Sequence, residues 1–182
     1  MVPELAHIRL SQIQLNATQC KVRRRSGVVA YVLPKRFRGG MPVEVIKRGD
    51  CLFHYGLFSN EKESEILYSL HFMVPRFLNL DFRTKMETIV HELYHIHPDF
   101  NGDLRRFKGG RLHGPTEKAY AKAVRSMTDV FLRGVVDAPY FGVQNLNYGR
   151  FVKEHGPILT GARPRAFRPR LIKVERPEIG QK

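Results

Sequence analysis

Two histidines and a glutamate in the run His91-Glu92-Leu93-Tyr94-His95 are the residues of this sequence best suited to metal chemistry. On an α-helix, residues four apart lie nearly one above the other, so His91 and His95 can offer two imidazole nitrogens to one metal ion. Glu92 then lies beside that ion, where a general base is needed. The spacing predicts a metal site with an adjacent proton acceptor.

The residues around this run predict the helix that it requires. From Phe82 onward, apolar side chains recur at about 100° per residue and form one stripe. The stripe comprises Phe82, Met86, Ile89, Val90, Leu93 and Ile96. His91 and His95 project from the opposite side. Asp81 is suited to cap the start of the helix, and Pro98 is suited to end it.

A third protein ligand is needed, because catalytic zinc usually has three, with the fourth position left to water. His113 is the preferred residue, since Gly109-Gly110 let the chain turn back before the next helix. Glu117 is the main alternative, because a glutamate from a second helix is another common third ligand. His97 lies about 140° around the helix from the other two histidines and is unsuited to the same ion. Asp103 remains open, although its position favours stabilising the loop.

The histidine run, a basic glycine-containing loop and His113-Gly114-Pro115 together resemble the SprT-like zinc metallopeptidases, whose signature is HExxH followed by a histidine in an HGP-type turn. They resemble more closely a phage and bacterial zinc metallopeptidase domain, in which HELYHI leads into a G-x-L-R-R segment, here Gly102 to Arg106. The resemblance covers roughly residues 65–120. It implies three Zn²⁺ ligands and one catalytic base, namely His91, His95 and His113, and Glu92.

The expected function is therefore that of a zinc metallopeptidase acting on protein or peptide substrates, with proteins associated with nucleic acid as one substrate class. Zinc would polarise a peptide carbonyl and lower the pKa of water towards about 7, and Glu92 would accept the proton during attack. Candidates for stabilising the oxyanion are Tyr94, Tyr120, Arg105 and Arg106. The alternative is a basic nucleic-acid-binding or structural assembly protein whose histidines hold a structural zinc ion or none.

The remaining patterns predict an α+β fold of the zincin-like type. Alternating apolar residues at 12–18 and 28–33 predict a hairpin, and residues 65–73 predict a further strand, buried, with His71 packed in the core. A second long helix is expected at 116–133, which lacks Gly and Pro. The expected architecture is a small N-terminal mixed or antiparallel sheet packed on the HExxH helix and on this second helix.

The chain is expected to divide into a zincin-like metallopeptidase domain at 1–137 and a basic, Pro/Gly-rich C-terminal extension at 138–182, an irregular tail. The formal net charge of the 182 residues is +14, which favours binding to polyanions such as nucleic acid. The residues expected to contact phosphate are Arg23, Arg24, Arg25, Arg163, Arg165, Arg168 and Arg170. A basic solvated surface or an acidic protein partner is the alternative interpretation.

The sequence also predicts where the protein is found. No apolar run reaches membrane-spanning length, and the first residues lack a signal-peptide pattern, so we expect a cytoplasmic protein. Cys20 and Cys51 have neither metal-binding nor redox spacing, and we expect them to be free thiols.

Overall fold

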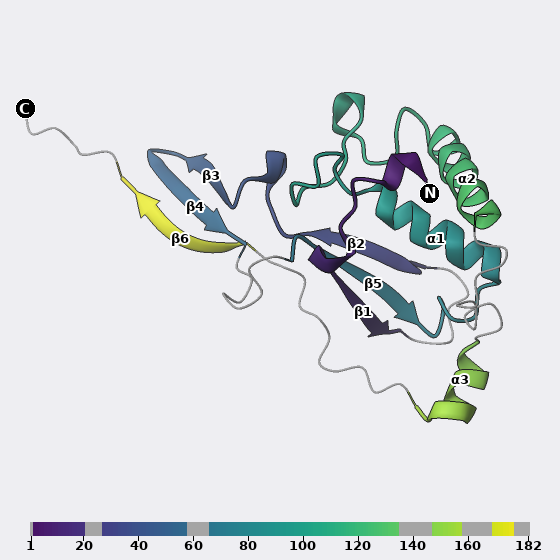
Figure 1. Cartoon of the computed structure of the whole chain (residues 1–182). Helices are drawn as coiled ribbons and strands as arrows, with labels where there is room; N and C mark the ends of the chain where they lie inside the picture. The colour runs from purple at the N-terminus through teal and green to yellow at the C-terminus, as the bar shows by residue number, and fades with distance from the viewer. Residues whose placement is uncertain (1, 21–26, 58–65, 135–146, 158–168, 177–182) are drawn as a thin grey trace, which may run out of the picture.

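The computed structural model describes residues 2–20, 27–57, 66–134, 147–157 and 169–176. Within these ranges the chain has an α+β fold with three α-helices and two three-stranded sheets, which confirms the α+β part of the prediction. The first sheet has the strand order β1-β5-β2, and the second has the order β3-β4-β6 (Figure 1).

Strand β5 (Tyr68–Val74) is the centre of the first sheet. It lies between β1 (Ile13–Gln19), which is parallel to it, and β2 (Ala30–Pro34), which is antiparallel. The predicted hairpin is therefore wrong, because its two strands each pair with β5 and not with each other. Alternation of apolar residues identified the strands but carries no information about their partners. The first four residues of β5 are buried, as expected for a central strand.

Helix α1 (Phe82–Tyr94) carries the histidine run. The side chain of Asp81 caps it by accepting a hydrogen bond of 2.9 Å from the backbone N–H of Thr84, as predicted. The helix ends one turn before the expected stop at Pro98, and His95 is its C-cap residue. It is shorter than predicted because the chain leaves the helix to form a β-bridge with the following loop.

Helix α2 (Glu117–Arg133) confirms the second predicted helix, and the side chain of Thr116 caps its first turn. The two helices lie side by side above the first sheet (Figure 1). Buried residues from α1, α2 and the N-terminal segment form one core cluster, namely Val2, Val90, Tyr120, Val124 and Met127. None of the described helices is both long enough and apolar enough to cross a membrane.

A second core cluster lies between the first sheet and the chain around the end of α1. It comprises Ile13, Val32, Tyr68, Leu70, Ile96 and Phe100. His71 on β5 is only 1% exposed, stacks on Tyr31 and forms hydrogen-bond contacts with Ser69 (2.9 Å) and Thr18 (3.3 Å). This confirms the prediction that His71 is a packed histidine.

The second sheet projects away from the helices (Figure 1). It consists of β3 (Val43–Arg48), β4 (Cys51–Gly56) and β6 (Arg170–Glu175), all antiparallel. The predicted irregular tail at 138–182 thus contains a strand and also a short helix, α3 (Tyr148–His155). The basic composition of this segment did not indicate a strand. Its apolar residues favour a strand only because β4 pairs with it.

Candidate metal centre

Three histidine side chains converge at the C-terminal end of α1. His91 lies in the last turn of the helix, His95 is its C-cap, and His113 comes from the loop before α2. The Nε2 atoms of His91 and His95 are 3.1 Å apart. One ring nitrogen from each of the three histidines lies within 4.8 Å of the others, so together they could hold a metal ion.

The spacing of the donor atoms fits a small metal ion. Two nitrogens that bind one zinc ion tetrahedrally, at the usual Zn–N length, lie about 3.3 Å apart. The separation of 3.1 Å between His91 and His95 is close to that value. His95 is buried and His113 is exposed, so His113 would close the site from the solvent side.

The protonation states of His91 and His95 also favour metal binding. Burial lowers the pKa of His95 to about 3, with smaller contributions from His91, His113 and Arg105. Burial, followed by the charge of His113, lowers the pKa of His91 as well. Both rings are therefore neutral at pH 7, the form in which imidazole binds a metal. Nδ1 of His95 is buried and has no hydrogen-bond partner in the described part of the chain.

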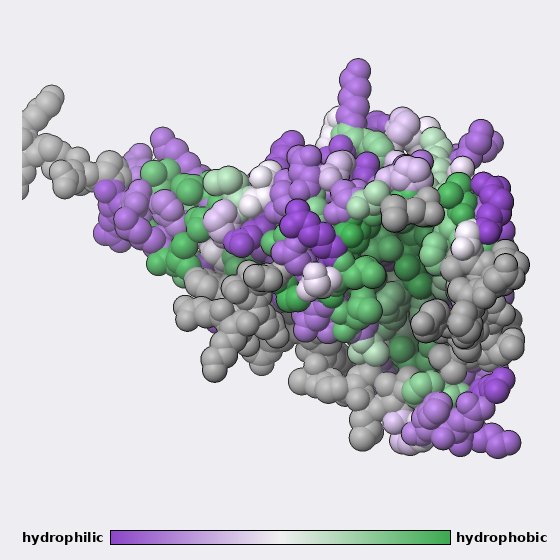
Figure 2. Space-filling view, in the orientation of Figure 1, coloured by the Kyte–Doolittle hydropathy of each residue, from purple (hydrophilic) through white to green (hydrophobic). Residues whose placement is uncertain are grey.

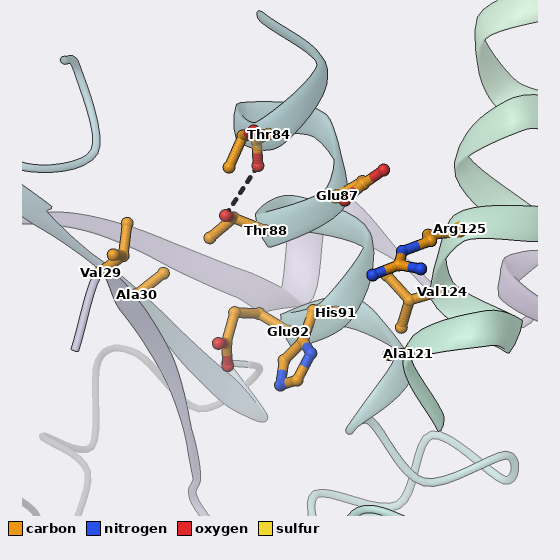
Figure 3. Close-up of a pocket in the computed structure, with 10 residues that line it drawn as sticks. All are labelled: Val29, Ala30, Thr84, Glu87, Thr88, His91, Glu92, Ala121, Val124 and Arg125. Atoms are coloured by element: carbon orange, nitrogen blue, oxygen red, sulfur yellow. Dashed lines mark hydrogen bonds between the residues drawn. The ribbon is translucent and has the colours of Figure 1, made fainter. Parts of the chain in front are cut away.

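Glu92 is the proton acceptor that the site offers. Its side chain is on the β2 side of α1, next to His91 in the groove (Figure 3). Only 7% of the residue is exposed, and burial raises the pKa of its carboxyl group to about 7, although a hydrogen bond from the Val32 backbone opposes the shift. A carboxyl group with a pKa near neutrality can accept and return a proton at physiological pH.

Tyr120 supports all three imidazoles. Its ring centroid lies 5.0 Å from that of His91, 5.3 Å from that of His95 and 5.2 Å from that of His113. Its hydroxyl group donates a hydrogen bond of 3.2 Å to the backbone carbonyl of His91, and burial raises its pKa. The sequence marked Tyr120 only as an oxyanion candidate. Its supporting position could not be found from the sequence, because it depends on how α2 packs against α1.

The two arginines among the oxyanion candidates have different partners. Arg105 donates a hydrogen bond of 2.9 Å to the Tyr94 carbonyl, lies over the Tyr94 ring and helps to lower the pKa of His95. Arg106 points elsewhere and pairs with Asp103 at 3.4 Å. Of these two arginines, Arg105 is therefore the one whose charge acts on the histidine cluster.

The alternative ligands do not join the cluster formed by the described residues. Glu117 is exposed and lines a cavity of about 320 Å³ beside His91 and His113. The carboxylate of Asp103 accepts a hydrogen bond of 2.9 Å from the Gly39 backbone, so it stabilises its loop. Ring Nδ1 of His97 accepts a hydrogen bond from the backbone of Asp99. The structure thus brings His113 to the other two histidines.

A groove of about 290 Å³ leads to the site between β2, α1 and α2. Figure 3 shows Glu92 and His91 at one end, with Thr84, Glu87 and Thr88 along α1 and Val29 and Ala30 opposite. The Val29 carbonyl accepts a hydrogen bond from Met73 on β5. Since backbone directions alternate along an antiparallel strand, the peptide groups of Ala30 and Val32 face away from β5. Among the described strands, β2 therefore has an open edge on this side.

Most of the basic residues predicted to contact nucleic acid lie outside the described part of the chain. Arg23, Arg24, Arg25, Arg163, Arg165 and Arg168 lie outside the described residues. Arg170 is described and exposed, at the start of β6. The nucleic-acid interaction through these segments stays a prediction.

Comparisons of the chain with protein-family models, with curated proteins and with solved structures gave no match. The resemblance to zinc metallopeptidases therefore rests on the motif residues alone.

Proposed function

We propose that the chain is a zinc-dependent metallopeptidase of zincin-like architecture that hydrolyses peptide bonds in protein or peptide substrates. The main support is the convergence of three histidines beside Glu92, a buried glutamate whose pKa is raised to about 7. Three histidine ligands with a fourth position for water or substrate are typical of catalytic zinc sites. A purely structural zinc site usually has four protein ligands, and the described residues supply three.

The proposed mechanism assigns the proton transfers to Glu92. Zinc, when bound, supplies a Lewis acid that polarises a peptide carbonyl and makes water nucleophilic near neutral pH. Glu92 accepts a proton from the attacking water while the new C–O bond forms. It then passes this proton to the amine nitrogen as the C–N bond breaks. Tyr120 keeps the three imidazoles in place through its ring contacts.

The groove beside β2 suits an extended peptide. A substrate strand in the groove could form hydrogen bonds with the outward-facing peptide group of Ala30 and with the carbonyl group of Val32, whose N–H already contacts Glu92. Proteins commonly bind an extended chain at a sheet edge in this way. Its scissile carbonyl would then lie beside Glu92 and the histidines. The small side chain of Ala30 lines the groove opposite α1 (Figure 3).

The test is Glu92→Gln, assayed with purified zinc-loaded protein and a fluorogenic protein substrate. We expect turnover to fall by about 10²–10⁴-fold, because the general base is lost, while the zinc content stays near one ion per chain. Glu87→Gln is the matched control, since Glu87 lines the same groove one helical turn away from the ligands. Full activity in Glu92→Gln would refute the proposal. Bound zinc without any turnover in the unchanged protein would favour a structural zinc site.

A further inference from the structure

A second cavity, of about 390 Å³, lies where the projecting sheet joins the rest of the molecule. Three arginines line it, with Arg36 and Arg38 from the turn after β2 and Arg106 from the loop after α1. Its apolar lining consists of Leu33, Pro34, Phe37, Leu57 and Pro169. The histidine cluster does not contribute to this cavity.

The charges around the cavity favour an anion. Two acidic residues, Asp103 and Glu44, also line it. The Asp103 carboxylate accepts a hydrogen bond from the Gly39 backbone and lies 3.4 Å from Arg106, so its charge is already balanced. Among the described residues that line the cavity, Glu44 is then the acidic residue left to oppose Arg36 and Arg38. A planar guanidinium group binds phosphate oxygens through two parallel hydrogen bonds, which makes arginine well suited to phosphate.

The turn that carries these arginines is held in position. The Arg36 backbone N–H donates a hydrogen bond of 3.0 Å to the Gly102 carbonyl. Gly40 has a left-handed φ of 78°, and a Cβ atom there would lie 2.8 Å from the carbonyl oxygen of Asn101. The turn and the loop therefore fit closely together. Arginines on a fixed turn lose less conformational freedom when a ligand binds.

Glu44 connects the cavity to one face of the projecting sheet. Glu44 on β3 is the register partner of Tyr55 on β4, so their side chains share a face, and Phe53 lies two residues away on the same face. The guanidinium group of Arg48 lies 5.9 Å from the centre of the Phe53 ring. The partners of these aromatic residues on β6 are exposed apolar residues, Leu171 and Val174. Figure 2 shows apolar residues among hydrophilic ones on this sheet.

We propose that this surface binds single-stranded nucleic acid. A phosphate group lies among Arg36, Arg38 and Arg106, and neighbouring bases stack on Tyr55 and Phe53. Aromatic rings beside a basic groove stack with any base, and only a single strand presents unstacked bases to them. An acidic peptide would use the arginines but not the aromatic face. The net charge of +14 adds long-range attraction for any polyanion.

Two variants test the two halves of the surface in the full chain, with a short fluorescent oligothymidylate as the probe and anisotropy as the readout. Arg38→Gln removes a phosphate contact, and Tyr55→Leu removes a stacking ring while it keeps an apolar side chain in β4. We expect Tyr55→Leu to weaken binding by at least about fivefold. Arg38→Gln should weaken it by about threefold or more and should flatten its dependence on salt.

Two further variants make the test selective. Arg133→Gln changes the net charge as much as Arg38→Gln does, but Arg133 is exposed at the far end of α2. It should weaken binding by less than about twofold, whereas Glu44→Gln should strengthen binding because it removes the facing negative charge.

Equal losses of affinity in the two arginine variants would mean that the nucleic acid is attracted by the net charge and not bound at the proposed site. If polyglutamate competes as well as oligothymidylate and Tyr55→Leu has no effect, the surface is a site for acidic protein. Thermal unfolding monitors the fold, and Phe53→Leu replaces Tyr55→Leu if that variant is unfolded.

Discussion

The two sheets of this protein place their side chains in opposite environments. In the first sheet, the first four residues of β5 are buried beneath strands and helices. In the second sheet, Gly56 is the only buried residue of the three strands. Near the first sheet, burial moves the pKa of Glu92 to about 7 and that of His95 to about 3. Side chains with shifted pKa values thus lie beside the buried sheet, while the side chains of the second sheet are mostly exposed to solvent.

This difference predicts how each region responds to substitution. Changes near the first sheet should affect metal binding and stability, because its side chains are desolvated and closely packed. Changes in the second sheet should affect the binding of a large partner and leave both properties nearly unchanged. The following substitutions test that division, starting with the largest expected effect.

Removal of His113 should have the largest effect on the metal centre. We expect His113→Ala to weaken zinc binding by more than about a thousandfold, since even groups that only support a ligand are worth about 10–100-fold. Glu117→Ala, the control, should change it by less than about threefold, because Glu117 lines the cavity without joining the ligand cluster. Competition with a coloured zinc chelator measures both affinities. The reverse result would make Glu117 the third ligand.

Truncation of one leucine in each sheet compares how much the two sheets contribute to the free energy of unfolding. Leu70 in β5 is 3% exposed and Leu171 in β6 is 50% exposed. Leu70→Ala should lower the free energy of unfolding by about 2–5 kcal/mol, because it leaves a cavity in the core. Leu171→Ala should change it by no more than about 0.5 kcal/mol. Denaturant unfolding of the metal-free protein measures both values. A similar loss in the two variants would contradict the exposed character of the second sheet.

Removal of the Tyr120 hydroxyl group should have a smaller effect. Tyr120→Phe keeps the ring beneath the imidazoles but loses the hydrogen bond to the His91 carbonyl. Since one such bond contributes about 1 kcal/mol, we expect zinc affinity to fall by no more than about tenfold. Tyr55→Phe in the exposed sheet is the matched control and should leave zinc affinity unchanged. If Tyr120→Phe behaves like His113→Ala, the hydroxyl group takes a direct part in the metal site.

Local patterns in the sequence were enough to predict part of this centre. His91, Glu92 and His95 lie on one helix, where spacing alone determines their direction, and the glycine-containing loop indicated that His113 could return to them. The position of Tyr120 and the hydrogen bond from Val32 to Glu92 could not be predicted. Both depend on packing between elements that are distant in sequence.

The fold shows the same limit. Each strand of the first sheet could be located from its apolar residues, but pairing with β5 instead of in a hairpin depends on tertiary contacts. Strand β6 was missed because Arg170, Lys173 and Glu175 give its segment the composition of a solvated tail. A strand in an exposed sheet needs no continuous apolar run, so its sequence carries a weaker signal.

The smallest predicted effect concerns pH and the buried His71. Burial, followed by the charge of Lys35, lowers the pKa of His71 in the folded protein below its ordinary value of 6.5. The unfolded chain therefore binds a proton more readily than the folded one as the pH falls through 6.5. The stability that neutral His71 provides is present above this pH and is lost progressively towards the folded-state pKa.

We expect the free energy of unfolding of metal-free protein to fall less steeply with decreasing pH in His71→Gln than in the unchanged chain. The three clustered histidines are the same in both proteins, so the difference between the two slopes isolates His71. Equal slopes would mean that His71 is protonated as easily in the folded sheet as in the unfolded chain, and the interior of the first sheet would then be less shielded from water than its packing indicates.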